Sequence, residues 1–313
     1  MNAWPESKPS ERSTGFRHEP DPSGVRMNHS AEPNASGPGM TSGREPDTSG
    51  RKTPMAAGRE AAGRVWLVGA GPGAADLLTV RAIRAIRGAG VLLVDDLVGP
   101  EVLRYARRSA RVVHVGKRGG CRSTPQAFIE QLMLREAQAG ERVVRLKGGD
   151  PTIFGRGGEE AEFLRAHGVE VEIVPGITAG LAAAGALGAP LTHRAHAHGV
   201  IFVTGHAKDE AAALDWGALG AAAAQGLTLV VYMGVAQAAA LQAGLRRALP
   251  GATPVGIAQN ASRPEQRVAH TTLDGLLRTL AEQRLGSPAI LIVGDVLRGA
   301  AALHHEMPIQ AAA

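Results

Sequence analysis

A glycine-rich stretch at residues 145–160 carries the residue types best suited to binding a ligand. It reads R-L-K-G-G-D-P-T-I-F-G-R-G-G-E-E, and its five glycines, one proline and acid pair predict a loop through which neither helix nor strand runs. A short apolar run, V-V-R-L, leads into it, and a segment with helical spacing follows it. In an open α/β sheet, ligands bind beyond the carboxyl ends of the strands, where glycines let backbone amides approach closely. We therefore expect a ligand-binding loop here, with an ordinary glycine-rich connection as the alternative.

A second glycine cluster, Gly69 to Gly73, invites comparison with dinucleotide-binding loops. The sequence G-A-G-P-G follows a predicted strand, precedes a predicted helix and has Asp95 and Asp96 downstream. However, the dinucleotide fingerprint needs a glycine three positions after its second glycine, and Ala74 stands there. Pro72 also removes an amide that would face a pyrophosphate. The spacing therefore disfavours a nicotinamide or flavin site.

Three histidines and the single cysteine are the other candidates for metal or nucleophilic chemistry. His193, His196 and His198 lie close together in sequence, but no cysteine, carboxylate pair or second histidine cluster accompanies them. We therefore expect no metal site. Cys121 has no neighbouring base in a recognisable motif, so we expect no catalytic role for it. One cysteine excludes an intramolecular disulfide and fits a reducing compartment.

Composition narrows the class of protein. The 313 residues are 44% hydrophobic with 41 glycines and 3% aromatic residues, enough for a sizeable aliphatic core in one large or two smaller domains. The net charge of +5 mildly favours an anionic ligand, but there is no lysine or arginine run and few aromatics, so we expect no nucleic-acid partner. No apolar stretch reaches the ~18 residues of a membrane helix, and the N-terminus lacks the apolar region of a signal peptide. We expect a cytoplasmic protein with no membrane association.

Apolar patterning predicts alternating strands and helices from Val65 onward. The expected strands are V-W-L-V-G-A, V-L-L-V-D-D, V-V-H-V-G, the run at Val143 and V-E-I-V-P-G. The expected helices are L-L-T-V-R-A-I-R-A-I-R, residues 125–138, the segment after the 145–160 loop and T-A-G-L-A-A-A-G-A-L-G. Such alternation specifies a mostly parallel sheet with helices on both faces.

An interruption at residues 190–199 divides this pattern from a second α/β unit. The strands expected there are V-I-F-V-T-G-H, T-L-V-V-Y-M-G, P-V-G-I-A-Q-N and P-A-I-L-I-V-G-D-V, with helices at 236–249 and 273–283. We therefore expect two α/β domains, at 65–195 and 196–305. Residues 1–64 are rich in glycine, proline, serine and charge, which predicts a disordered tail, and 306–313 form a short C-terminal tail.

Six motifs occur in one order along the chain. They are V-G-A-G-P-G with L-L-T at 77–79, V-G-K-R-G-G at 115–120, the 145–160 stretch, V-P-G-I-T-A at 174–179, P-L-T-H-R at 190–194 and Y-M-G at 232–234. Together they resemble the tetrapyrrole methylase family, in particular its uroporphyrinogen-III C-methyltransferases. The resemblance spans about residues 64–303. It implies a homodimer whose chains each have two α/β domains with a ligand cleft between them.

The resemblance also implies that S-adenosylmethionine is the methyl donor, bound folded in that cleft and held largely by backbone groups. A sulfonium cation with an amino-acid tail and a ribose needs carbonyls, a carboxylate, a hydroxyl and apolar walls for its adenine. The positions that match the family's donor site are Pro72, Gly148, Gly149, Asp150, Ile153, Thr178, Ala179, Met233 and Ala261.

The methyl acceptor implied by the resemblance is uroporphyrinogen III, methylated at two ring carbons, C2 and C7, to give precorrin-2. Asp95 matches the family's proposed proton acceptor and Lys117 its proposed proton donor. Without the motifs, a turn-capping aspartate and a solvated lysine would be the simpler interpretation of these two residues. Because the substrate carries many carboxylates, cationic groups must line its part of the cleft. The matched residues are Arg118, Arg156, His193 and Arg194.

Two other functions are compatible with parts of the sequence. One keeps the fold but methylates a later precorrin or ribosomal RNA, and the V-G-K-R-G-G and T-H-R segments argue against it. The other is a nicotinamide-binding oxidoreductase or a non-catalytic ligand-binding protein, which the glycine spacing, Asp95 and Lys117 oppose. Some relatives are fused to a dehydrogenase and ferrochelatase module that makes sirohaem, and we expect no such module here. Precorrin-2 would then pass on to sirohaem or to cobalamin.

Overall fold

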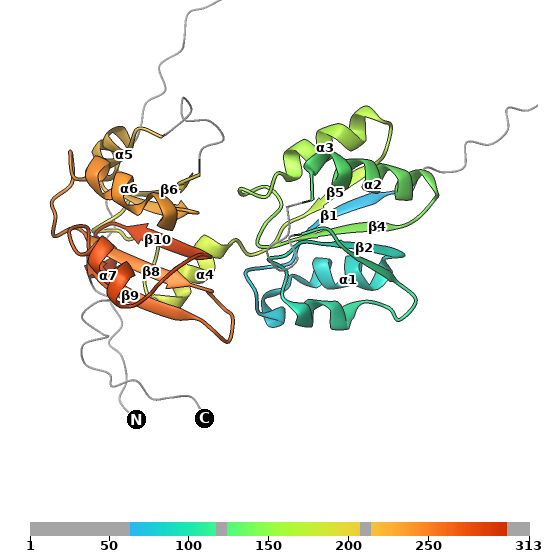
Figure 1. Cartoon of the computed structure of the whole chain (residues 1–313), viewed down its shortest axis with the longest axis horizontal. Coiled ribbons are helices and arrows are strands. Elements are labelled where there is room, and N and C mark those ends of the chain that lie inside the picture. Colours follow the sequence, from blue (N-terminus) through green and yellow to red (C-terminus); the bar gives the residue numbers. More distant parts are fainter. Residues whose placement is uncertain (1–62, 117–123, 207–213, 299–313) are drawn as a thin grey trace, which may run out of the picture. The chain divides into compact units, whose positions relative to one another are not determined.

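The computed structural model describes residues 63–116, 124–206 and 214–298, which form two five-stranded sheets. In the first sheet the strand order is β3-β2-β4-β1-β5, and every neighbouring pair is parallel (Figure 1). The strands are β1 (Val65–Gly69), β2 (Val91–Val94), β3 (Arg111–His114), β4 (Val143–Lys147) and β5 (Val171–Val174). Parallel neighbours need crossover connections, so the strand–helix alternation of this half correctly predicts the sheet.

Helices cover both faces of the first sheet. They are α1 (Val80–Gly88), α2 (Gln126–Gln138) and α3 (Gly157–Ala166). Helix α1 packs on the face to which β1 contributes Trp66 and Val68, whereas α2 and α3 pack on the face that buries Val65 and Leu67 (Figure 1). Successive side chains of a strand point to opposite faces, so a strand covered on both faces is apolar throughout. This explains the uninterrupted apolar sequence of β1.

The second sheet is mixed. Its strand order is β6-β7-β10-β8-β9, in which β6 and β7 pair in parallel and the other neighbours are antiparallel. The strands are β6 (Gly199–Thr204), β7 (Leu227–Tyr232), β8 (Pro254–Gln259), β9 (Arg267–Thr272) and β10 (Ala289–Val293). Strand β9 is absent from the predicted strands, because R-V-A-H-T-T is mostly polar and forms an edge strand that is only half buried.

Four helices pack on the described part of this second sheet. They are α4 (Ala179–Ala186), α5 (Trp216–Ala223), α6 (Ala238–Leu245) and α7 (Leu276–Glu282). Helices α5, α6 and α7 pack on the face that buries Leu229 and Val231, and α4 packs on the face that buries Val230 and Tyr232. Helix α4 thus precedes the boundary expected near residue 195 but contacts the second sheet, while the division into domains itself stays a prediction.

Short 3-10 helices occupy several of the connections that follow strands. They are η1 (Ala75–Leu77), η2 (Pro100–Tyr105) and η4 (Val235–Gln237). The helix predicted at 236–249 therefore divides into η4 and the shorter α6. Among the residues that the structure describes, no helix is long and apolar enough to cross a membrane.

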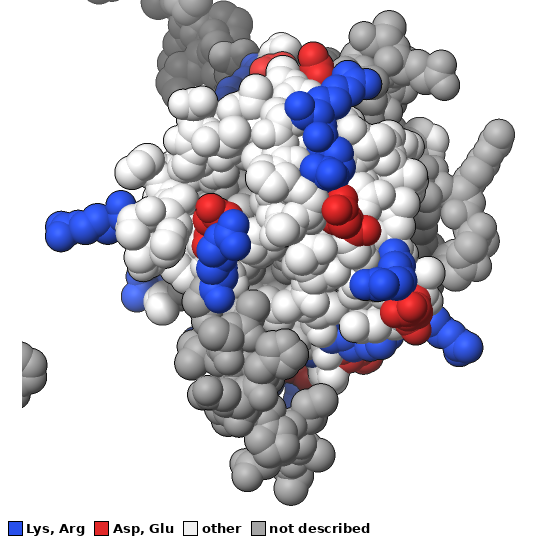
Figure 2. All heavy atoms as spheres, turned by 90° about the vertical axis from the view of Figure 1, so that its left-hand side faces the viewer, with Lys and Arg blue, Asp and Glu red and all other residues white. Residues whose placement is uncertain are grey.

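Charged side chains of both signs are interspersed on the face shown in Figure 2, over a largely uncharged surface. Exposed opposite charges also pair in the second half of the chain, where Arg246 Nε lies 2.7 Å from Asp274 Oδ1. Opposite charges at such distances partly neutralise each other's field. As far as its described residues show, this face offers no continuous basic patch of the kind that binds nucleic acid.

Candidate active site

The loops that follow β1 and β4 are joined by a pair of backbone hydrogen bonds. The Gly149 amide donates to the Gly71 carbonyl at 2.7 Å, and the Gly71 amide donates to the Gly149 carbonyl at 3.2 Å. Gly176, which follows β5, lies so close that a Cβ atom there would be 2.3 Å from the Gly149 carbonyl oxygen. Only glycine permits this approach, so three loops meet at the carboxyl edge of the first sheet. That edge is where open α/β sheets bind ligands.

The irregular part of the glycine-rich stretch is shorter than residues 145–160, which corrects the sequence-based expectation. Strand β4 continues through Lys147 and helix α3 begins at Gly157, so residues 148–156 form the loop. The strand continues because its parallel pairing with β1 extends to Lys147, which lies opposite Gly69. The acidic first turn of α3 complements the positive end of the helix dipole, which favours an early helix start.

Asp150 holds this loop in place. Its carboxylate accepts hydrogen bonds from the Thr152 amide at 2.7 Å, the Thr152 hydroxyl at 2.5 Å and the Gly176 amide at 2.9 Å. The residue is 8% exposed, and it is not among the residues that line the neighbouring pocket. The described contacts of Asp150 therefore join the loop after β4 to the loop after β5, and its contact with a methyl donor stays a prediction.

A pocket of about 240 Å³ lies beside these loops. Eight of the nine positions predicted for the methyl donor line this pocket, and Asp150 is the exception. They come from loops of the first sheet, from the start of α4 and from the ends of β7 and β8. Apolar side chains and backbone groups dominate the lining, with a few polar side chains among them, as is typical of sites for small organic molecules.

A buried hydroxyl pair fixes the start of α4 at this pocket. Thr178 Oγ1 and the Tyr232 hydroxyl oxygen are 2.7 Å apart, and the Gly180 amide donates to the Tyr232 hydroxyl at 2.8 Å. Burial raises the pKa of the Tyr232 phenol above its ordinary value, against the lowering effect of these hydrogen bonds. The phenol is therefore a neutral hydrogen-bonding group that holds two lining residues, Thr178 and Ala179, in position.

Three lining residues other than glycine have left-handed backbone conformations. The φ angle is 51° at Phe154, 53° at Met233 and 51° at Asn260. Such angles are uncommon for residues with a Cβ atom and cost free energy, so the surrounding structure must enforce them. Local strain of this kind clusters at binding sites, where it presents backbone groups in fixed directions. No propensity pattern in the sequence indicates it.

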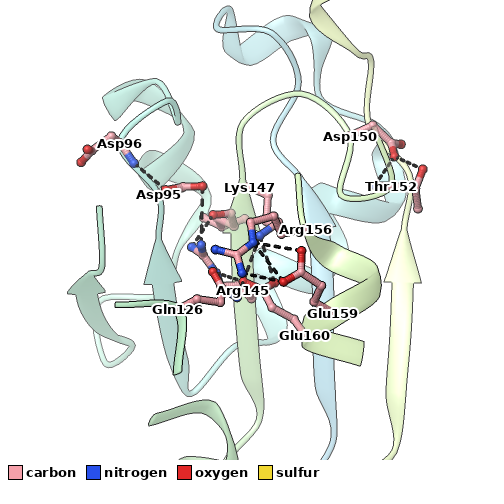
Figure 3. Close-up of polar contacts among 11 residues, drawn as sticks. Asp95, Asp96, Gln126, Arg145, Lys147, Asp150, Thr152, Arg156, Glu159 and Glu160 are labelled. Carbon is pink, nitrogen blue, oxygen red and sulfur yellow. Dashed lines mark hydrogen bonds and ion pairs between the residues drawn. The ribbon is translucent and has the colours of Figure 1, made fainter. Parts of the chain in front are cut away.

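A buried network of charged side chains underlies the loop after β4 (Figure 3). Arg145 and Lys147, two residues apart on β4, each have 2% of their surface exposed, and Glu160 of α3 is fully buried. Arg145 Nε lies 3.3 Å from Glu160 Oε1, and Lys147 Nζ lies 3.0 Å from Glu160 Oε2. The side-chain amide of Gln126 also donates from Nε2 to Glu160 Oε1 at 3.1 Å. The two buried cations thus share one carboxylate.

Asp95 lies at the carboxyl end of β2, next to this network (Figure 3). Its Oδ2 atom is 3.5 Å from Arg145 Nη2, and its Oδ1 atom accepts a hydrogen bond from the Asp96 amide at 3.1 Å. Its side chain is 35% exposed, so it can meet a ligand. Lys117 and Arg118, predicted as proton donor and substrate-binding residue, lie outside the described residues, as does Cys121.

The other residues predicted to bind substrate carboxylates are exposed and do not line the 240 Å³ pocket. Arg156 precedes α3 and pairs with Glu159, with Nη2 and Oε2 2.5 Å apart. His193 and Arg194 lie in the turn before β6, where His193 Nδ1 accepts a hydrogen bond from the Ala195 amide at 3.1 Å. The structure thus places eight of the nine predicted donor positions around one pocket. Arg156, His193 and Arg194 are not among the residues that line it.

Several lining residues are absent from the sequence-based predictions. Arg263, after β8, lines the pocket and donates from Nη2 to the Leu97 carbonyl at 2.6 Å. Its neighbour Ser262 does not line the pocket, but its Oγ accepts a hydrogen bond from the Ala74 amide at 3.2 Å. Tyr232 also lines the pocket. The segment N-A-S-R-P follows a predicted strand end, so its turn residues were a usable signal. The position of Tyr232 depends on strand register, which local sequence does not reveal.

The three histidines considered as metal ligands do not converge. His193 and His196 stack, with ring centroids 4.7 Å apart. Across residues 63–116, 124–206 and 214–298, no three His, Cys, Asp or Glu side chains are grouped closely enough to hold a metal ion.

Comparison with known proteins identifies the family and the fold. The family described as Tetrapyrrole (Corrin/Porphyrin) Methylases matches residues 64–277. A uroporphyrinogen-III C-methyltransferase of Pseudomonas aeruginosa is 56% identical over 235 residues, which cover 75% of this chain and 94% of that protein. A siroheme synthase of Azotobacter vinelandii is 48% identical over 75% of this chain and 50% of its own length, so the match spans about half of that relative.

The solved structures agree. A uroporphyrin-III C-methyltransferase from Thermus thermophilus, in complex with S-adenyl homocysteine, has a TM-score of 0.63 and 42% sequence identity, covering 76% of this chain and 100% of that one. The two-sheet α/β fold and the pocket at the carboxyl edge of its parallel sheet are thus those of a methyltransferase. The chain belongs to the tetrapyrrole methylases.

Proposed function

We propose that this chain transfers methyl groups from S-adenosylmethionine to uroporphyrinogen III at ring carbons C2 and C7, producing precorrin-2. In each transfer a ring carbon attacks the methyl carbon in line, a carbon–carbon bond forms and the carbon–sulfur bond breaks. The donor leaves as a neutral thioether, and the ring system loses one proton. The protein therefore has to align two molecules and to accept a proton.

The observation that carries this proposal is the 240 Å³ pocket, lined by eight of the nine positions that the family motifs assign to the donor. Its apolar walls suit an adenine, and its backbone carbonyls and Thr178 hydroxyl suit a ribose and an amino-acid tail. The glycine junction of the loops after β1, β4 and β5 brings backbone atoms to the pocket without side chains in the way. The names of the relatives and the bound S-adenyl homocysteine of the Thermus thermophilus enzyme support the same donor.

We assign proton handling and substrate binding to residues outside the donor pocket. Asp95 accepts the ring proton, since its carboxylate pairs with the buried Arg145 guanidinium and is partly exposed to solvent. Lys117 is the proton donor of this proposal. The substrate carboxylates pair with Arg118, Arg156, His193 and Arg194.

We extend the proposal to the wider cellular role. The chain acts in the cytoplasm as a homodimer, and its product is passed on to sirohaem or cobalamin synthesis. The single cysteine, Cys121, fits a reducing compartment, and the siroheme synthase relatives support the first destination.

Donor binding is tested by calorimetric titration with S-adenosylhomocysteine and, separately, with nicotinamide adenine dinucleotide. We expect saturable binding of the first and none of the second. Ala261→Phe fills the pocket and weakens S-adenosylhomocysteine binding by about tenfold or more, because overpacking costs 1–3 kcal/mol. Ala221→Phe, at an exposed position of α5, is the matched control and leaves binding unchanged. Binding of the dinucleotide alone would refute the proposal.

A further inference from the structure

Arg145 is buried where an apolar residue would ordinarily stand. Along β4, Val143, Arg145 and Lys147 point to the face that α2 and α3 cover, and Val143 belongs to the apolar core of that face. Arg145 and Lys147 are each 2% exposed. Replacing a buried ion network by well-packed apolar residues is often neutral or stabilising, so stability alone is a weak reason for these charges.

The charges of this network do not balance within the buried residues. Glu160 supplies one negative charge to two cations, with hydrogen bonds of 3.0 Å from Lys147 Nζ to each of its oxygens and of 3.3 Å from Arg145 Nε. Burial, and then the neighbouring Arg145 charge, lower the pKa of Lys147, while Glu160 raises it. A guanidinium stays protonated in proteins, so Arg145 is the permanent cation of the pair.

Among the residues that the structure describes, the other anion paired with Arg145 is Asp95. Its carboxylate is held at both oxygens, Oδ1 by the Asp96 amide at 3.1 Å and Oδ2 by Arg145 Nη2 at 3.5 Å (Figure 3). Because β2 and β4 are neighbours in the sheet, the end of β2 lies directly beside the Arg145 side chain. The Arg145 guanidinium thus pairs through Nε with Glu160 and through Nη2 with the partly exposed carboxylate of Asp95.

We propose that Arg145 is a positioning residue for Asp95, anchored by Glu160 so that the Asp95 carboxylate keeps one orientation at the end of β2. In that orientation the carboxylate takes the proton that the ring system releases after the carbon–sulfur bond of the donor has broken. Arg145 itself gains and loses no proton. The inference rests on the role proposed above for Asp95.

Lys147 provides a matched control. Both cations lie on β4, both are 2% exposed and both bind Glu160. Among the described residues, Arg145 forms an ion pair with Asp95, whereas Lys147 feels the Asp95 charge only at longer range, where it raises the pKa of Lys147. In Arg145→Met and in Lys147→Met, Glu160 keeps one cationic partner, so the two changes cost similar stability. They differ in whether Asp95 keeps its partner.

The test measures kcat and KM for methylation of uroporphyrinogen III under anaerobic conditions, together with the Kd for S-adenosylhomocysteine. We expect Arg145→Met to lower kcat by about 30-fold or more, as for a misplaced reacting group, with KM and Kd within about threefold of wild type. Lys147→Met should lower kcat by at most about threefold. Equal losses of kcat in both variants, while Asp95→Asn is slow, would overturn the inference and leave the proposed function standing.

Asp95→Asn provides the double-mutant cycle. If Arg145 acts through Asp95, adding Arg145→Met to Asp95→Asn lowers kcat by less than about twofold, whereas independent effects would multiply. A normal kcat in Asp95→Asn would overturn both the role of Asp95 and this inference. Should either methionine variant fail to fold, the charge-retaining pair decides. A lysine at position 145 is too short to reach both Glu160 and Asp95, so we expect Arg145→Lys to lower kcat about fivefold or more. Lys147→Arg should not lower kcat to this extent. Equal kcat values for these two variants would refute the proposal.

Discussion

The Tyr232 hydroxyl is a single-atom link between the second sheet and the start of α4. It bonds to Thr178 Oγ1 at 2.7 Å and accepts from the Gly180 amide at 2.8 Å, in a buried site. Tyr232→Phe leaves both groups without this partner, so we expect a loss of about 1–3 kcal/mol in the free energy of unfolding and weaker binding of S-adenosylhomocysteine. Denaturant titration measures the first effect. Tyr105→Phe, whose hydroxyl bonds to the exposed Arg104, is the control and should cost little.

The same hydroxyl makes stability depend on alkaline pH. Burial raises the pKa of Tyr232 in the folded protein, while the unfolded chain has the ordinary value of about 10. The folded state therefore holds more protons above that pH, so the stabilisation is fully present below about pH 10 and is lost as pH rises through the folded pKa. We expect wild type to lose more unfolding free energy than Tyr232→Phe between about pH 9 and 11. Parallel pH curves for the two proteins would contradict this.

Glu160 carries the largest stability effect expected from one side chain. It is fully buried between Arg145 and Lys147, so Glu160→Gln leaves two buried cations without an anion among their described neighbours except Asp95. We expect a loss of about 3–5 kcal/mol, as for breaking a buried ion pair. Glu162→Gln, on the exposed side of the same helix, should change stability by less than about 0.5 kcal/mol. Similar denaturation midpoints for the two variants would rule out the network as a structural anchor.

At the scale of single elements, two glycines of α4 respond oppositely to alanine. A Cβ atom at Gly180 would lie 2.6 Å from the Tyr232 hydroxyl oxygen, whereas one at Gly185 meets nothing within 4 Å. Gly180→Ala therefore pushes the helix start from the sheet and costs about 1–3 kcal/mol, and Gly185→Ala stabilises the protein by about 0.5–1 kcal/mol. Thermal melts of both variants check this. If Gly180→Ala melts at or above the wild-type temperature, the packing of α4 described above is wrong.

Elements with strong apolar patterns were predictable, and those defined by tertiary packing were not. The run V-W-L-V-G at β1 and the helical spacing of α2 appear in the structure where the sequence places them. Helix α5 has small residues, G-A-L-G-A-A-A, with no clear apolar periodicity, and it is absent from the predicted helices. Its packing on α6 and β7 supplies what local sequence does not. Strand β9 could not be predicted for a related reason, since edge strands need little apolar surface.

At the scale of the whole molecule, the sequence predicts the first sheet well because parallel strands need the helices that its pattern displays. The antiparallel part of the second sheet has no such signature. The loops of the candidate site were predictable, since glycines and motif order mark them, and eight of the nine positions expected for the donor line the pocket. The left-handed backbone at Phe154, Met233 and Asn260 and the burial of Arg145 were not, because both depend on contacts between distant segments.

The most direct test of the proposed function is an anaerobic incubation of the purified protein with uroporphyrinogen III and S-adenosylmethionine, followed by product mass and absorbance. The donor pocket, Asp95 and the family membership together predict a product that has gained two methyl groups. Folded protein that binds S-adenosylhomocysteine but leaves the mass of uroporphyrinogen III unchanged would contradict the proposal and assign the pocket to another acceptor.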